Sequence, residues 1–139
     1  MLDIEKLKDL FKDYPYIASA YLFGSYVSGR ISPMSDVDIA VLLKEPCPKG
    51  RHLIHQMDYL GVKIEEVLKK EVDIVEMNRQ GLIFQHNVLR TGKLIYDADS
   101  SFRANYVSRL ISAYCDFEPT LRFMNNYYFD GYKRRLARL

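Results

Sequence analysis

Residues 22–43 read LFGSYVSGRISPMSDVDIAVLL, and this stretch decides the fold. An apolar run from Ile17 leads up to Gly24, and a second apolar run follows Asp38, which predicts two buried strands. Asp36 and Asp38 are two positions apart, so their carboxylates leave the same face of the second strand, roughly 6–7 Å apart along the chain. Mg2+ prefers carboxylate, water and phosphate oxygens. The stretch therefore predicts a metal-dependent phosphate site.

The turn between the two strands supplies the phosphate side of this site. Gly24 lets the backbone approach a phosphate closely, while Ser25 adds a hydroxyl and a backbone N–H as donors. A lone Gly-Ser turn or a lone Asp-x-Asp is common and carries little weight. Their combination, with ten residues between Ser25 and Asp36, is much less common by chance and favours a nucleotide site.

A third carboxylate, Asp73, lies in a short β-branched stretch, Val72–Val75, that predicts another strand. A charge within an apolar strand is costly unless it is paired or binds a metal. The alternative is an edge strand on which Asp73 simply faces water. Glu71 and Glu76 are rivals for the same role, and strand alternation places Glu71 on the face of Asp73 and Glu76 on the other.

The remaining chain alternates helices with strands, which indicates an α+β (α/β-like) domain with one central sheet. The tail from Ser101 is helical in pattern, and we expect Pro119 to interrupt it. We assign residues 1–100 to the domain and 101–139 to a helical extension that packs on it or on a partner. Apolar spacing and breakers predict helices near 4–11, 53–69 and 82–89, a short helix after Ser25, and strands near 17–23, 37–43, 72–75 and 93–96.

Composition indicates a globular protein of the cytoplasm that does not enter a membrane. The 139 residues carry a net charge of only +2, which disfavours a nucleic-acid partner. No run approaches the ~20 apolar residues needed to span a bilayer, and the charged N-terminus lacks the apolar core of a signal peptide. Cys47 and Cys115 lie far apart in the sequence, so a disulfide is disfavoured.

Two other groups of residues have ordinary interpretations. The three histidines form neither a catalytic triad nor a zinc pattern; they are His52, His55 and His86. The tail ends in a basic cluster of Lys133, Arg134, Arg135 and Arg138 after several aromatic residues. A solvated helix end is the first interpretation of this cluster, docking of a partner the second, and contact with RNA the third.

The motifs together resemble the signature of the DNA polymerase β-type nucleotidyltransferase superfamily. The resemblance rests on Gly24-Ser25, the ten-residue gap, Asp36-x-Asp38 and the later Asp73. The short chain is further similar to the minimal nucleotidyltransferases, and among them to the MntA-like antitoxins of HepT/MntA toxin–antitoxin pairs; Gly29 and Ser35 support this. The motifs cover roughly residues 22–76. The resemblance implies a central mixed sheet flanked by helices, with a C-terminal helical tail.

The same resemblance implies an activity and a partner. Members of this kind transfer AMP from ATP to a tyrosine of a HEPN-domain ribonuclease toxin (AMPylation) and so neutralise it, in a complex with that toxin. The implied cofactors are two Mg2+ ions, with ATP as substrate. The implied catalytic residues and metal ligands are Asp36, Asp38 and Asp73, and the implied nucleotide-binding residues are Gly24, Ser25 and Ser35.

Two alternatives stay open on the sequence. One is an antitoxin that neutralises its partner by docking alone, without catalysis. The other is a nucleotidyltransferase with a different acceptor, an antibiotic or an RNA 3′ end. The short chain and near-neutral charge disfavour the second alternative, and the intact set of three aspartates disfavours the first.

Overall fold

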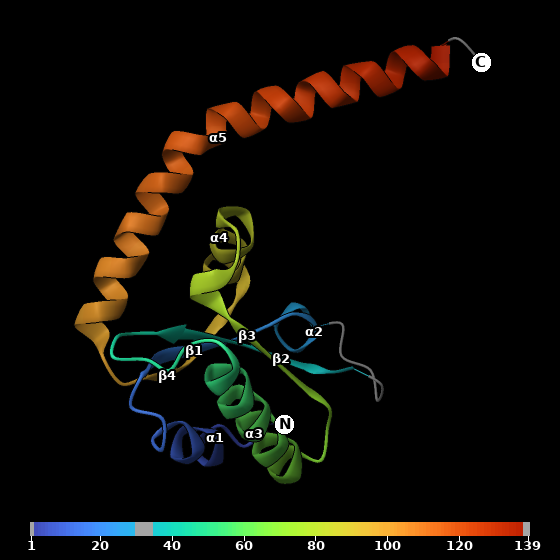
Figure 1. Ribbon diagram of the computed structural model, residues 1–139. Helices are drawn as coiled ribbons and strands as arrows, with labels where there is room; N and C mark the ends of the chain where they lie inside the picture. The colour runs from blue at the N-terminus through green and yellow to red at the C-terminus, as the bar shows by residue number, and fades with distance from the viewer. Residues whose placement is uncertain (1, 30–34, 138–139) are drawn as a thin grey trace.

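The computed structural model describes residues 2–29 and 35–137 and contains a mixed four-stranded sheet in the order β3-β2-β1-β4 (Figure 1). β1 (Ile17–Phe23) pairs antiparallel with both β2 (Val37–Leu43) and β4 (Lys93–Asp97). β3 (Val72–Glu76) runs parallel to β2 at one edge. β1 and β2 are apolar and almost wholly buried, as expected for central strands covered on both faces. The predicted fold class is confirmed.

Helices cover the two faces of the sheet. α1 (Ile4–Phe11) and α3 (Arg51–Leu68) pack on one face (Figure 1). α4 (Leu82–Thr91) and the start of α5 (Ser100–Ala137) pack on the other. Because strand side chains alternate, β2 sends Ile39 and Val41 to the first face and Ala40 to the second. Asp38 belongs to the second face by the same alternation.

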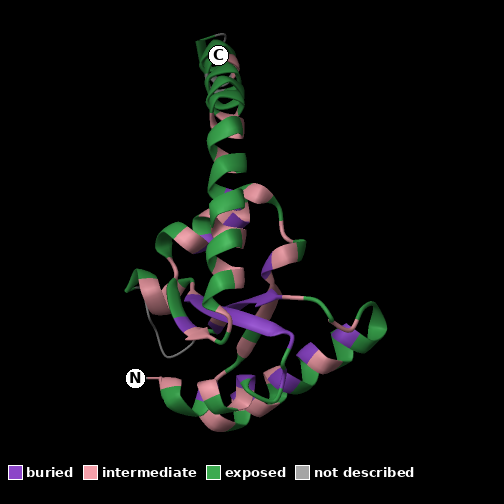
Figure 2. Cartoon of the chain, turned by 90° about the vertical axis from the view of Figure 1, so that its left-hand side faces the viewer, coloured by how far each residue is buried: buried purple, intermediate pink, exposed green. Residues whose placement is uncertain are grey.

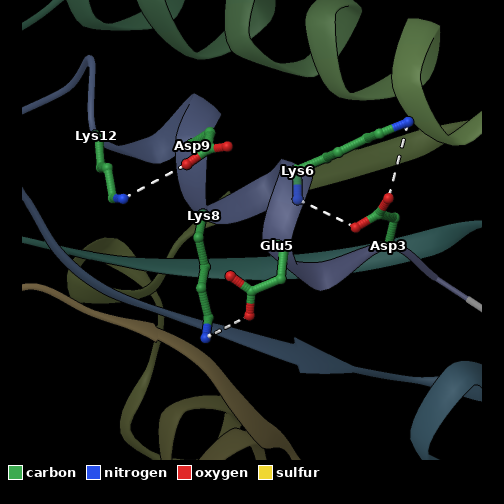
Figure 3. Close-up of polar contacts among 6 residues, drawn as sticks. All are labelled: Asp3, Glu5, Lys6, Lys8, Asp9 and Lys12. Carbon is green, nitrogen blue, oxygen red and sulfur yellow. Dashed lines mark hydrogen bonds and ion pairs between the residues drawn. The ribbon is translucent and has the colours of Figure 1, made fainter.

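The first helix is set by a side-chain cap and by its apolar face. The Asp3 carboxylate accepts a hydrogen bond from the backbone N–H of Lys6 at 3.2 Å (Figure 3). Leu7 and Phe11 on the inner face are fully buried. Ion pairs three residues apart line the outer face, such as Glu5–Lys8 at 3.3 Å (Figure 3). These pairs are exposed and screened, so the buried face holds α1 in place.

The last helix differs from the sequence expectation. α5 continues from Ser100 to Ala137 with Pro119 inside it, so Pro119 does not interrupt the helix. The helix instead changes direction about halfway along (Figure 1), as helices do at an internal proline. The half before Pro119 packs on α4 and β1. The half after it projects away from the sheet, and from Arg122 to Ala137 every residue with a described exposure except Gly131 is exposed (Figure 2).

Two smaller expectations can also be compared with the structure. Cys47 and Cys115 are both free thiols. Arg138 of the predicted basic cluster lies outside the described residues. Within the described ranges, no helix combines the length and apolar character that crossing a bilayer requires.

Candidate nucleotide site

The carboxylates of Asp38 and Asp73 come from neighbouring strands at the same position along the sheet. β2 and β3 are parallel, and Asp38 and Asp73 are register partners. Partners in adjacent strands project from the same face. On the other side of β2, the partner of Asp38 is Phe23, the last residue of β1. The site therefore lies where β1 ends and β2 begins, on the face that α4 covers.

Gly24 brings the turn backbone directly against the Asp38 side chain. Gly24 has φ +76°, a conformation that residues with a Cβ rarely adopt. A Cβ at this position would overlap the Asp38 Oδ2 atom. The Gly24 carbonyl then accepts the first bonds of α2 (Ser25–Ser28), from the N–H groups of Val27 and Ser28 at 3.1 and 3.0 Å. The predicted pairing of Gly24 with the acidic motif is thus a direct contact.

The remaining predicted residues lie at the start of β2. Asp36 comes directly before the strand and is exposed, whereas Asp38 is half-buried. Ser35 precedes Asp36 and is also half-buried. Partial burial raises the pKa of the Asp38 carboxyl above its ordinary value, and the negative charges of Asp73 and Asp36 raise it further. Asp38 is therefore close enough to both other aspartates to feel their negative charges.

Asp73 itself is exposed, and β3 is an edge strand. Asp73 can face water without a metal, so its burial gives no argument for metal binding. Its position opposite Asp38 is what associates it with the site. Among residues 2–29 and 35–137, no three acidic, histidine or cysteine side chains gather closely enough to hold an ion by themselves. No ion pair within those ranges neutralises Asp36, Asp38 or Asp73.

The donor set nevertheless fits Mg2+ together with a nucleotide. Mg2+ in phosphate-transfer sites is commonly held by one or two carboxylates, by waters and by phosphate oxygens of the substrate, not by a complete protein cage. Asp38 and Asp73 stand opposite each other on adjacent strands, and the Asp73 charge helps to raise the pKa of Asp38, an effect that a divalent cation would oppose. Asp36, Asp38 and Asp73 would hold such ions.

Glu71 and Glu76, the two rivals of Asp73, differ in their surroundings. The Glu76 carboxylate forms an ion pair with Arg79 at 3.1 Å. The Glu71 carbonyl accepts a hydrogen bond from the Val37 N–H at 2.9 Å, which joins β3 to β2 beside the site. His52 and His55 are exposed on α3, and His86 is half-buried. Of the two rival glutamates, only Glu76 is therefore paired with another side chain among the described residues.

Sequence reasoning missed one wall of the site, which α4 provides. A cavity of about 580 Å³ lies between α2 and α4, and Gly24 and Ser25 are part of its lining. From α4 it is lined by Phe84, Asn87, Val88 and Thr91, at spacings of three and four residues that mark one helical face. That spacing was visible in the sequence, but nothing there placed α4 beside the Gly-Ser turn. A larger cavity of about 620 Å³ lies at the other end of β2, around Leu43 and Asn78, and none of the predicted site residues lines it.

A glycine turn and paired aspartates on a mixed sheet define a phosphate-handling class of enzyme fold. The sequence profile of the family described as polymerase beta, nucleotidyltransferase, matches residues 5–101. The chain belongs to this family.

Two curated relatives of this chain are named as protein adenylyltransferases. The protein adenylyltransferase MntA of Aphanizomenon flos-aquae is 32% identical over 96 residues, which cover 63% of this chain and 62% of the relative. The putative protein adenylyltransferase MJ1305 of Methanocaldococcus jannaschii is 32% identical over 116 residues, which cover 77% of this chain and 75% of the relative. The matched region thus spans a little under two thirds of the first relative and three quarters of the second.

Solved structures share the fold over almost the whole chain. A chain of a toxin–antitoxin crystal structure with AMP-PNP aligns with a TM-score of 0.74 at 24% identity, covering 92% of this chain and 99% of that chain. A structure of a tri-AMPylated HEPN toxin of Shewanella oneidensis in complex with its MNT antitoxin aligns at 0.67 and 22% identity, covering 91% and 95%. Both alignments extend beyond the family match into α5.

Proposed function

We propose that this chain is the antitoxin of a toxin–antitoxin pair and acts as an Mg2+-dependent protein adenylyltransferase. It transfers AMP from ATP to a tyrosine of a HEPN-type ribonuclease toxin and so neutralises the toxin. The observation that carries the proposal is the pairing of Asp38 with Asp73 next to Gly24. The names of the relatives and the toxin–antitoxin complexes among the structural neighbours support the choice of AMP and of the acceptor.

Each site residue has a defined task in this reaction. The backbone of Gly24 approaches the triphosphate closely, because no side chain intervenes, and Ser25 donates to phosphate oxygens, with Ser35 as a further contact. Bound Mg2+ would neutralise charge on the triphosphate and lower the pKa of the acceptor hydroxyl. Asp36 and Asp38 would hold the metal ions, and Asp73 would also ligate the ion beside the acceptor hydroxyl.

AMP passes directly from ATP to the acceptor tyrosine, without a covalent enzyme intermediate. The phenolic oxygen of the acceptor tyrosine forms a bond to the α-phosphorus of ATP. The bond from that phosphorus to the bridging oxygen breaks, and pyrophosphate leaves. Asp73 accepts the phenolic proton. Catalysis of this kind depends on positioning and on charge neutralisation, which the residues at the sheet edge provide.

The decisive test is transfer of labelled AMP. The full chain is incubated with α-labelled ATP, Mg2+ and the HEPN-type protein encoded beside it. We expect the Asp36→Asn Asp38→Asn double variant to lose transfer by at least about a hundredfold, since charge stabilisation at the reacting centre is the largest single catalytic contribution. Asp58→Asn, an exposed aspartate of α3, serves as the matched control. Equal labelling by the wild type and the double variant contradicts the proposal.

The projecting half of α5 is the proposed docking surface for the toxin. Before Pro119, the inner stripe of the helix holds Tyr106, Leu110, Tyr114 and Phe117, which are buried or half-buried. The same helical stripe continues after Pro119 through the half-buried Leu121 to Met124 and Tyr128, which are exposed. Met124 and Tyr128 are 42% and 68% exposed. A partner helix laid on this stripe would continue the packing that the body begins.

Docking and catalysis can be separated experimentally. We expect Met124→Glu Tyr128→Glu to weaken complex formation with the toxin at least tenfold and to leave ATP binding unchanged. Asn126→Glu places one negative charge on the opposite side of the helix and is the control for each of the two single substitutions. If Asp36→Asn Asp38→Asn still protects cells from the toxin in full, neutralisation occurs by docking alone.

A further inference from the structure

The cavity between α2 and α4 has the composition of a small-molecule site. Its volume of about 580 Å³ lies within the usual range for ligand pockets. Apolar walls come from Phe23, Val27, Phe84 and Val88, and the polar lining side chains are three hydroxyls and the Asn87 amide. Phe84 packs edge-to-face on Phe23, with ring centroids 5.6 Å apart, so both rings are held in place. A flat apolar group would find fixed aromatic and aliphatic surfaces here.

The position of the cavity connects it to the phosphate side of the site. Gly24 and Ser25 line the cavity, and Gly24 also lies against the Asp38 carboxylate. A nucleotide with its triphosphate at Gly24 therefore has this cavity within reach of its other end. α2 follows the end of β1 (Figure 1); its Tyr26 and Val27 pack toward the α1–α3 face, and Val27 also lines the cavity shared with α4.

Asn87 of α4 supplies a side-chain amide at the cavity wall. Its Oδ1 accepts a hydrogen bond from Arg90 Nη2 at 3.0 Å, and its backbone carbonyl accepts one from Thr91 Oγ1 at 2.7 Å. Within the described residues, the Nδ2 group donates to no other atom, and Oδ1 retains a second lone pair. An asparagine amide pairs in a bidentate manner with N6 and N7 of adenine, donating to N7 and accepting from the N6 amino group. Guanine offers two acceptors at the same edge and does not match.

We propose that the cavity between α2 and α4 binds the adenine base of ATP, and that Asn87 selects adenine by pairing with its N6 and N7 atoms. This inference rests on the proposed function, since it assigns the nucleoside end of the same substrate. Phe84 and Val88 contribute the apolar wall, and Arg90 orients the amide. Asn87 is a specificity-determining residue and takes no part in the transfer step.

The test measures binding, so it is independent of any acceptor. The full chain with Mg2+ is titrated with α,β-methylene-ATP, whose reacting bond is not cleaved. The other ligands are the 7-deaza form of this analogue, the corresponding GTP analogue and inorganic triphosphate. The variants are Asn87→Leu and, as matched control, Asn125→Leu on the exposed part of α5. We expect Asn87→Leu to weaken binding of the ATP analogue about 5- to 100-fold, because one bidentate pair to a base supplies that much discrimination. Triphosphate binding should not change.

Ligand and protein changes can then be combined. The wild type should bind the 7-deaza analogue more weakly than the ATP analogue, and Asn87→Leu should bind the two equally. A variant that keeps the full preference for ATP over GTP and over the 7-deaza analogue overturns the assignment, and the cavity is then free for the acceptor. Parallel losses for the ATP analogue and triphosphate also overturn it, because they indicate a structural effect. A wild type that binds neither nucleotide nor triphosphate overturns the proposed function itself.

Discussion

Gly24 and Asp38 lie so close together that a single methyl group on Gly24 would occupy the place of an Asp38 carboxylate oxygen. The backbone of the turn and the acid of the strand therefore form one unit. Any ligand that approaches the turn meets the carboxylate at the same time. Position 24 therefore requires glycine for two reasons, the backbone conformation of the turn and the space that the Asp38 carboxylate occupies.

Gly24→Ala should accordingly lower ATP affinity in addition to the stability that its backbone strain costs. Gly29, at the other end of α2, also has a positive φ of +81°, but a Cβ there meets nothing within 4 Å. Gly29→Ala therefore measures the strain, about 1–2 kcal/mol of unfolding free energy. We expect Gly24→Ala to cost at least that much and, in addition, to weaken ATP binding at least tenfold. Thermal unfolding and nucleotide titration of both variants check this, and equal ATP affinities would contradict it.

Asp38→Asn should stabilise the fold at neutral pH in the absence of metal. Burial and the nearby charges raise the pKa of Asp38, so the folded chain holds this proton to higher pH than the unfolded chain. Stability therefore declines as pH rises from the ordinary value of 3.8 through the raised pKa, and stays lower above it. Asparagine removes the charge, and we expect a rise of roughly 1–4 °C in Tm at pH 7 that fades near pH 4.

Urea or thermal unfolding between pH 4 and 8 measures this difference. Asp58→Asn on the exposed face of α3 controls for the general loss of one negative charge. An Asp38→Asn variant that is less stable than wild type at pH 7 would show that the carboxylate stabilises the fold and is not under strain.

Tyr106→Phe should loosen the contact between α4 and α5. The Tyr106 hydroxyl donates to Gln85 Oε1 at 2.6 Å, and Gln85 is only 7% exposed. Without the donor, this buried oxygen loses its partner, at a cost of about 1–2 kcal/mol of unfolding free energy. Tyr114→Phe is the matched control, because Tyr114 contacts α4 through its ring, stacked on His86 at 3.5 Å. Similar stabilities for the two variants would be the contrary result.

Pro119→Ala should change the direction of the projecting half of α5. Proline removes one backbone hydrogen bond and bends a helix, so alanine should straighten it and add about 1–3 kcal/mol of helix stability. The stripe formed by Leu121, Met124 and Tyr128 would then present itself at a different angle. Small-angle scattering of the variant should show a changed shape, and titration with the toxin should show weaker binding. An unchanged toxin affinity would place the docking surface elsewhere.

Much of the fold was predictable because local signals and burial agree. The apolar runs into Gly24 and out of Asp38 became the two central strands, and the apolar spacing of residues 4–11 became α1. The course of α5 through Pro119 was not predictable, since proline lowers helix propensity without fixing whether the chain stops or bends. The α4 wall at Asn87 also required the structure, because its contact with the Gly-Ser turn depends on how two distant segments pack.

The two halves of α5 should also differ in how they resist proteases. Amides before Pro119 are protected by the packing of Leu110 and its neighbours on the body. Between Arg122 and Ala137 the residues with a described exposure are exposed apart from Gly131, and a helix that does not pack on a body opens readily in water. A protease would thus cleave the free chain first in this segment, and a bound partner would shield it. The lifetime of the intact chain would then be coupled to the amount of partner present.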